Sequence, residues 1–142
     1  RQAQIVELGG LKLLLPLARS KDVEVQRLAV HALANLSVDG ESSSSTRPSK
    51  CEFAHAPFFS TANQELMAEE GAIDTLVIML GSSYPHLQRQ ASKALANLGV
   101  NAKNKERICT AGGVGPLVAL AGSKSPGVAV EAVAALANLA VN

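Results

Sequence analysis

Aromatic residues are scarce in this sequence, which contains no Trp, one Tyr and three Phe among its 142 residues. A core must therefore be built from aliphatic side chains, and the apolar fraction of 47% supplies enough of them. An excess of either charge is also lacking, because 13 basic and 12 acidic residues leave a formal net charge of +1. Without a global field the chain is not expected to bind nucleic acid, and any charge-based recognition must be local.

The sequence contains only two cysteines and no long apolar run. The two cysteines, Cys51 and Cys109, do not amount to a disulfide framework. This usage favours a reducing compartment, and we expect the cytoplasm, with the nucleus as the second compartment. No run of about 18 apolar residues is present that could span a bilayer, so direct membrane insertion is not expected.

One stretch of the sequence occurs three times. Residues 30–37 (VHALANLS) return as 92–99 (SKALANLG) and again as 133–140 (VAALANLA). The asparagine of this stretch and a glycine upstream of it recur with the same two spacings, 62 and 41 residues: Asn35, Asn97 and Asn138, and Gly9, Gly71 and Gly112. A period of 41 is typical of solenoid units of two or three helices. The first interval contains 21 extra residues.

Each unit is predicted to contain a short helix, a glycine turn, a second helix, another turn and a long third helix. Glycine can adopt the left-handed conformation that ends a helix, whereas a phosphate-binding loop would need a following Lys-Ser or Lys-Thr. The long helices are expected at 22–38, 86–100 and 127–141. The second helix of the first unit, at 11–19, is apolar all round and is expected to be buried on every side.

This unit of about 40 residues resembles the armadillo repeat, with Gly-Gly-Val/Leu before the second helix and Ala-Leu-Ala-Asn-Leu near the end of the third. The resemblance implies an all-α fold, a right-handed α-solenoid of about three repeats, and we expect a fragment of a longer array. The expected parts are repeat 1 at 1–39 with a truncated first helix, a flexible insertion at 40–60, repeat 2 at 61–101 and repeat 3 at 102–142. Within the family, residues 5–11 and 34–36 are similar to the tails of armadillo-repeat kinesins and to vacuolar-type armadillo scaffolds.

Armadillo arrays hold extended peptides in a concave groove lined by their third helices, and the resemblance implies the same function here. The recurring third-helix asparagine would bond the backbone of the bound segment, at Asn35, Asn97 and Asn138. An amide side chain both donates and accepts, so it can satisfy both groups of a peptide unit. The alternative is that each asparagine caps or bridges loops within its own array.

The aromatic residue that import receptors place four residues before this asparagine is missing. His31, Lys93 and Ala134 occupy those positions, which disfavours a receptor for basic import signals. One turn further back lie Arg27 and Arg89, and residues four and eight apart share a helix face. The side of the groove formed by these basic residues and His31 is predicted to bind an extended acidic or phosphorylated segment of a protein partner. The alternative is that these side chains are only solvated by water.

The insertion carries two further candidate features. Its polar residues form a candidate phosphorylation segment beside basic residues: Ser42, Ser43, Ser44, Ser45, Thr46 and Ser49. Its aromatic residues form either a cover for a nearby apolar patch or a motif that docks on a partner: Phe53, Phe58 and Phe59.

No catalytic, cofactor-binding or metal-binding residues are predicted. The histidines lack a nucleophile and a carboxylate at any motif spacing. Cys51 and His55 provide two metal ligands, whereas a structural zinc site needs four. We therefore expect a protein-interaction scaffold without enzymatic activity. The alternative is a structural or targeting array that acts through repeat stacking or through self-association of its exposed ends.

Overall fold

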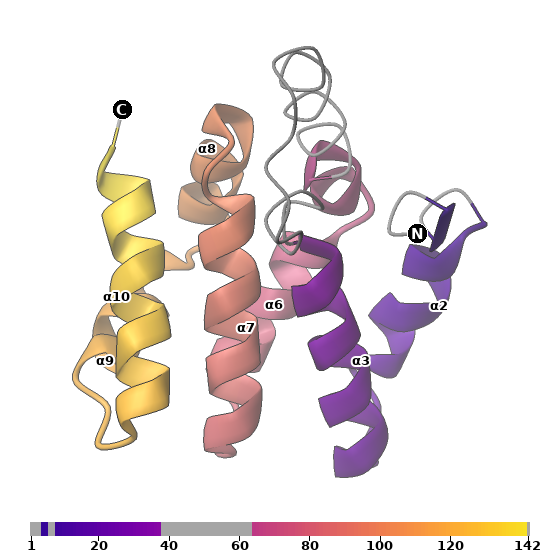
Figure 1. Cartoon of the computed structure of the whole chain (residues 1–142), viewed down its shortest axis with the longest axis horizontal. Coiled ribbons are helices and arrows are strands. Elements are labelled where there is room, and N and C mark those ends of the chain that lie inside the picture. The colour runs from indigo at the N-terminus through magenta and orange to yellow at the C-terminus, as the bar shows by residue number, and fades with distance from the viewer. Residues whose placement is uncertain (1–3, 6–7, 38–63, 142) are drawn as a thin grey trace, which may run out of the picture.

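The computed structural model describes residues 4–5, 8–37 and 64–141, and these residues contain helices and no strand. The helices are α2 (Gly10–Leu17), α3 (Val23–Ser37), α6 (Ala72–Leu80), α7 (Pro85–Leu98), α8 (Ala102–Thr110), α9 (Val114–Ala121) and α10 (Pro126–Ala140), and residues 64–69 are also helical. The long helices α3, α7 and α10 form the front layer in Figure 1, with α7 packed between the other two. The shorter helices lie behind them and at their sides.

A left-handed glycine precedes the second helix of every unit. The φ angles are 82° at Gly9, 95° at Gly71 and 80° at Gly112. Residues with a Cβ rarely adopt this conformation, so glycine is needed for the chain to leave the first helix and enter the second. The predicted glycine turn is confirmed at all three positions.

The long helices begin at the expected signals. The carboxylate of Asp22 accepts hydrogen bonds from the backbone N–H groups of Glu24 at 2.9 Å and Val25 at 3.4 Å, which caps the start of α3. Helices α7 and α10 begin with Pro85 and Pro126. Proline is tolerated in the first turn, where a backbone N–H would have no partner in the helix.

Aliphatic side chains at equivalent positions of the three units form one continuous core. Leu33 and Leu95 are buried, and Leu136 packs against the same cluster while remaining partly exposed. Alanine recurs four residues before each of these leucines, and all three alanines are buried: Ala29, Ala91 and Ala132. Their small side chains let neighbouring helices approach closely, so the core needs no aromatic residue.

Gln64 joins the ends of two long helices. Its side-chain amide donates to the backbone oxygen of Ser37 at 3.1 Å and to that of Asn97 at 3.0 Å. Lys105, which lies 41 residues later, donates from Nζ to the backbone oxygen of Val141 at 2.8 Å, just beyond α10. The side chain at this repeat position therefore hydrogen-bonds carbonyl groups at the ends of the long helices.

The prediction that residues 11–19 are buried on every side was wrong. Helix α2 ends at Leu17, and in it only Leu11 is buried. Leu13 and Leu17 remain 69% and 45% exposed. The counterparts of these two leucines in the second unit, Thr75 and Met79, are buried because a preceding repeat covers them.

The predicted insertion 40–60 lies outside the described residues, together with its candidate phosphorylation segment and phenylalanines. Within the described ranges, none of the helices combines the length and the apolar character that crossing a bilayer requires.

Candidate peptide-binding face

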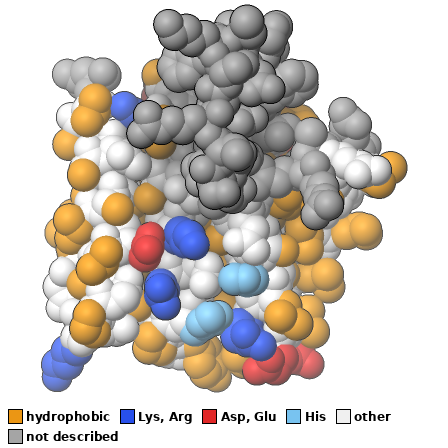
Figure 2. All heavy atoms as spheres, in the orientation of Figure 1, with side chains coloured by type: hydrophobic (Ala, Val, Ile, Leu, Met, Phe, Trp, Pro, Cys, Tyr) orange, Lys and Arg blue, Asp and Glu red, His pale blue; other side chains and the backbone are white. Residues whose placement is uncertain are grey.

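The third-helix face is the surface formed by the outward sides of α3, α7 and α10, and Figure 2 shows it from the front. It includes all the residues that the sequence predicted for a peptide groove: Arg27, His31, Asn35, Arg89, Lys93, Asn97 and Asn138. Each of these side chains is exposed or half-buried. Because α3, α7 and α10 pack side by side, the structure brings the three sets of residues onto one surface.

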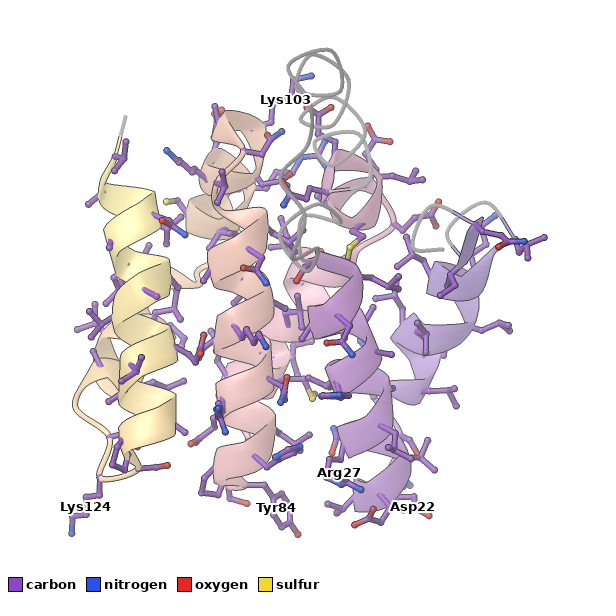
Figure 3. The ribbon with its side chains drawn as sticks, viewed as in Figure 1. Asp22, Arg27, Tyr84, Lys103 and Lys124 are labelled. Carbon is purple, nitrogen blue, oxygen red and sulfur yellow. The ribbon has the colours of Figure 1, made fainter. Side chains whose placement is uncertain are left out.

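The three long helices start along the same edge of this face. Figure 3 labels Asp22, Tyr84 and Lys124 at or just before the first turns of α3, α7 and α10, and Arg27 lies close to this edge. Helix N-termini carry partial positive charge, so basic residues nearby do not stabilise the helices. Helix α7 has no acidic residue, although His86 and Arg89 lie near its start. The positive potential is therefore concentrated here without a benefit to helix stability.

Arg27 forms an ion pair with Glu24 of the same helix. The carboxylate of Glu24 accepts hydrogen bonds from Nη2 at 2.8 Å and from Nε at 3.3 Å. In α7 the residue equivalent to Glu24 is His86, so Arg89 has no such partner three residues before it. Within the described residues, no carboxylate lies within 4 Å of Arg89 or Lys93. These two cations are therefore the ones available to an anionic ligand.

The pKa of His86 reflects the positive charges around it. Partial burial lowers the pKa of His86 below its ordinary value, and the nearby charges of Arg27, His31 and Arg89 lower it further. Glu24 opposes this shift. The imidazole is therefore mainly neutral at pH 7, and an anion bound beside it would favour the protonated form.

Arg89 lies at the junction of the second and third repeats. A Cβ atom placed on Gly127 in the first turn of α10 would lie 3.2 Å from Cδ and 3.3 Å from Nε of Arg89. The stem of Arg89 thus packs across the start of α10, where a larger residue would displace it. Glycine at this position leaves room for the arginine on the third-helix face.

Asn97 and Asn138 make hydrogen bonds within the array. Nδ2 of Asn138 donates to the backbone oxygen of Ala96 at 2.7 Å. Nδ2 of Asn97 donates to Oγ of Ser37 at 3.3 Å. Each amide therefore reaches the preceding long helix. Both bonds use the donor side of the amide and leave the side-chain oxygen to accept from another group.

Three residues that shape this face were not predicted from the sequence: Glu24, His86 and Gly127. Glu24 and Arg27 are three residues apart on one helix, and this spacing by itself indicates a side-chain pair. His86 has the same spacing from Arg89, so the charge difference between the two units could have been read from the sequence. The proximity of Gly127 to Arg89 depends on repeat packing and had no signal in the sequence.

A separate open cleft of about 520 Å³ lies away from the third-helix face. It is lined by residues of the helix 64–69, of α6 and of α8 and its end: Ala68, Ile73, Asp74, Lys103, Glu106, Arg107, Thr110 and Ala111. Acidic and basic side chains are mixed in it, so it does not select a ligand by charge. Among the described residues, no group of three or more His, Cys, Asp and Glu side chains could hold a metal ion.

Several solved structures are similar to this fold. A designed armadillo repeat protein in complex with the peptide (KR)4 is 28% identical, with a TM-score of 0.79, over 96% of this chain and 49% of that protein. A structure described as computationally designed armadillo repeat proteins for modular peptide recognition is 27% identical, with a TM-score of 0.77, over 96% of this chain and 50% of the other. The chain therefore spans about half the length of these two proteins. No curated protein matches this sequence.

The family model of the armadillo/β-catenin-like repeat matches residues 2–38, 60–100 and 101–141. The fold expected from the sequence, a right-handed α-solenoid of armadillo repeats, is thereby confirmed. The narrower similarity to kinesin tails and vacuolar-type scaffolds stays a prediction. The three matches account for most of the residues, and the chain belongs to the armadillo/β-catenin-like repeat family.

Proposed function

We propose that this chain is a non-catalytic protein-interaction scaffold whose third-helix face binds an extended acidic or phosphorylated segment of a partner protein. The observation that carries the proposal is that Arg89 and Lys93 have no carboxylate partner among the described residues, whereas Arg27 has one. Two unpaired cations four residues apart on one helix match successive anionic groups of a ligand.

The similar structures support a peptide as the ligand. One of these designed proteins is in complex with the basic peptide (KR)4, and another is described as made for modular peptide recognition. The third-helix face of the present chain is basic around α7, so a peptide bound there should have the opposite charge. The asparagine oxygens of Asn97 and Asn138 would accept from the backbone N–H groups of such a segment.

The proposal is tested by fluorescence anisotropy with four labelled peptides of equal length: an acidic Glu/Ser peptide, the same peptide with phosphoserine, the basic peptide (KR)4 and a neutral Gly/Ser peptide. We expect the two anionic peptides to bind at least about tenfold more tightly than (KR)4, with the phosphorylated form tightest and with affinity falling as salt rises. Tighter binding of (KR)4, or equal binding of all four, would contradict the proposal. A DNA oligonucleotide that competed as well as the phosphopeptide would show a non-specific polyanion surface instead.

Affinity for the acidic peptide should rise as the pH is lowered from about 7.5 to about 5.5. A bound carboxylate raises the pKa of His86 from its lowered value, so binding takes up a proton and is favoured at lower pH. The Glu/Ser peptide suits this measurement because its carboxylates stay ionised over the range, whereas phosphate loses charge. The variant His86→Asn should lose part of the dependence. An affinity that fell with decreasing pH would contradict the role given to His86.

We also propose a cytoplasmic location, with the nucleus as the second compartment. Cys109 is an exposed free thiol, and such groups persist where the environment is reducing. A fluorescent fusion that entered the secretory pathway would contradict this assignment.

A structural array is the second candidate function. It is favoured by large exposed apolar side chains, including Leu13 and Leu17 of α2 and Val130 and Val133 of α10. Figure 2 shows hydrophobic side chains along both lateral margins of the molecule, over α10 on one side and over α2 on the other.

A further inference from the structure

Two histidines lie on the two helices that form the junction between the first and second repeats. His31 belongs to α3 and His86 to the first turn of α7, and these helices pack against each other. Both side chains are exposed. Figure 2 shows the histidine side chains of the described residues close together over α3 and α7, with Lys and Arg side chains on both sides. This part of the third-helix face therefore gathers cationic and titratable groups from two repeats.

The groups of this cluster are close enough to act on one another. Partial burial lowers the pKa of His86, and the positive charges of Arg27, His31 and Arg89 lower it further. Such an effect requires short distances, because water and salt screen distant charges. Among the described residues, no carboxylate lies within 4 Å of either imidazole or of Arg89. An anion bound between these groups would therefore relieve their mutual repulsion.

Arg89 contributes a cation that is already held in place. A Cβ atom on Gly127 would lie 3.2 Å from Cδ and 3.3 Å from Nε of Arg89, so the arginine stem packs across the start of α10. A side chain restrained in this way loses less freedom when a ligand binds. The planar guanidinium can donate two hydrogen bonds to two oxygens of one anion, and the imidazoles add donors from both helices.

The composition of the cluster favours one phosphoryl group over a row of carboxylates. A phosphoryl group has three acceptor oxygens and a charge of about −1.5 to −2 at pH 7, so it can accept from a guanidinium and two imidazoles at once. A carboxylate has two oxygens and a single charge. On α10, the positions equivalent to His86, Arg89 and Lys93 have no charged side chain: Gly127, Val130 and Ala134. The cations therefore do not continue across α10 as a long acidic segment would require.

We infer that the junction of α3 and α7 binds one phosphoryl group, on a phosphoserine or phosphothreonine of the partner segment, through Arg89, His31 and His86. This site rests on the proposed function, since the segment must lie on the third-helix face. The two histidines then determine the preference for a phosphorylated segment over an acidic one. Lys93, a point charge one turn beyond Arg89, attracts either kind of segment.

Fluorescence anisotropy with two peptides of nearly equal charge tests this assignment at about pH 7.5, where phosphoserine is mainly a dianion. One Gly/Ser peptide has a single phosphoserine, and the other has two glutamates in its place. The wild-type chain should bind the phosphopeptide about tenfold more tightly. In His31→Ala/His86→Ala, affinity for the phosphopeptide should fall about tenfold and affinity for the glutamate peptide less than about threefold. Both histidines are exposed, so the variant should keep the wild-type helical content.

Lys93→Ala is the comparison variant, and it should weaken binding of both peptides by a similar factor because an ammonium group does not distinguish the two anions. Equal affinity of the wild-type chain for the two peptides would overturn the phosphoryl site and leave the proposed function intact. A preference for the phosphopeptide that survived in His31→Ala/His86→Ala would do the same. If neither peptide bound, the proposed function itself would fail, and the site with it.

Histidine NMR locates the phosphoryl group independently of affinity. The ring signals of His31 and His86, assigned with the two single alanine variants, should both shift when the chain is saturated with the phosphopeptide. Unchanged signals would overturn the site. Inorganic phosphate should displace the phosphopeptide only at millimolar concentration, because it lacks the contacts of the peptide backbone. Displacement at the concentration of the peptide itself would assign the site to free phosphate and overturn the inference.

Discussion

Reversing the charges of Arg89 and Lys93 together is expected to lower the affinity for acidic or phosphorylated peptides by about 100-fold. Neither side chain has a carboxylate partner among the described residues, so each is free to pair with an anionic ligand. Glutamate at both positions would replace two attractions with two repulsions on one side of α7. Fluorescence anisotropy of Arg89→Glu/Lys93→Glu against the wild-type chain measures the loss.

Lys103→Glu/Arg107→Glu is the matched control for this double variant. It makes the same change in net charge on α8, and Lys103 and Arg107 line the separate cleft rather than the third-helix face. The ion pair between Lys103 and Glu65 is long, at 3.7 Å, and largely exposed on the lysine side, so its loss should cost little stability. Equal losses of affinity in the two double variants would show that net charge alone determines binding.

Leu95→Ala is expected to lower the free energy of unfolding by about 3 kcal/mol. Leu95 is buried in α7, the long helix that packs against both α3 and α10. Removing its side chain leaves a cavity that the neighbouring backbones cannot fill, and both repeat junctions are weakened. Urea denaturation followed by circular dichroism gives the change, under conditions where the chain is monomeric.

The equivalent leucine of the last repeat provides the comparison. Leu136 occupies the same position in α10 but is only partly buried, because α10 packs against α7 and α9 among the described residues and has no long helix on its other side. Leu136→Ala should therefore cost about 1 kcal/mol, in proportion to the smaller apolar area that it removes from contact. Equal losses of stability in the two variants would contradict the expectation that a leucine between two repeats contributes more than its equivalent in the last repeat. The stability of the solenoid would then not be a sum of contributions from single repeats and from contacts between adjacent repeats.

The recurrence of short motifs was sufficient to predict most of the fold. Asn35, Asn97 and Asn138 defined the period, and Gly71 and Gly112 marked turns that the structure confirms by their positive φ angles. These features are local, because a left-handed turn and a helix start depend on a few adjacent residues. The insertion at 40–60 stays a prediction, since it lies outside the described residues.

The candidate site was predicted only as a set of residues on one surface. The sequence alone did not separate the neutralised Arg27 from the unpaired Arg89, although Glu24 and His86 stand at equivalent positions. The sequence left open whether these asparagines bind a peptide or bond within the array, and it did not predict the donor bonds of Asn97 and Asn138 to the preceding long helix. Their direction depends on how closely the long helices approach, which is a property of packing.

The sequence by itself determined the repeat, its register, the positions of the helices and the basic side of α7, because periodicity and turn residues act within a single unit. Only the tertiary structure decided which equivalent residues are buried. Val30 and Val133 occupy the same repeat position, yet one is covered by a neighbouring helix and the other is exposed. The physical reason is that burial in a solenoid depends on the presence of the adjacent repeat, and a residue's own sequence context does not contain that information.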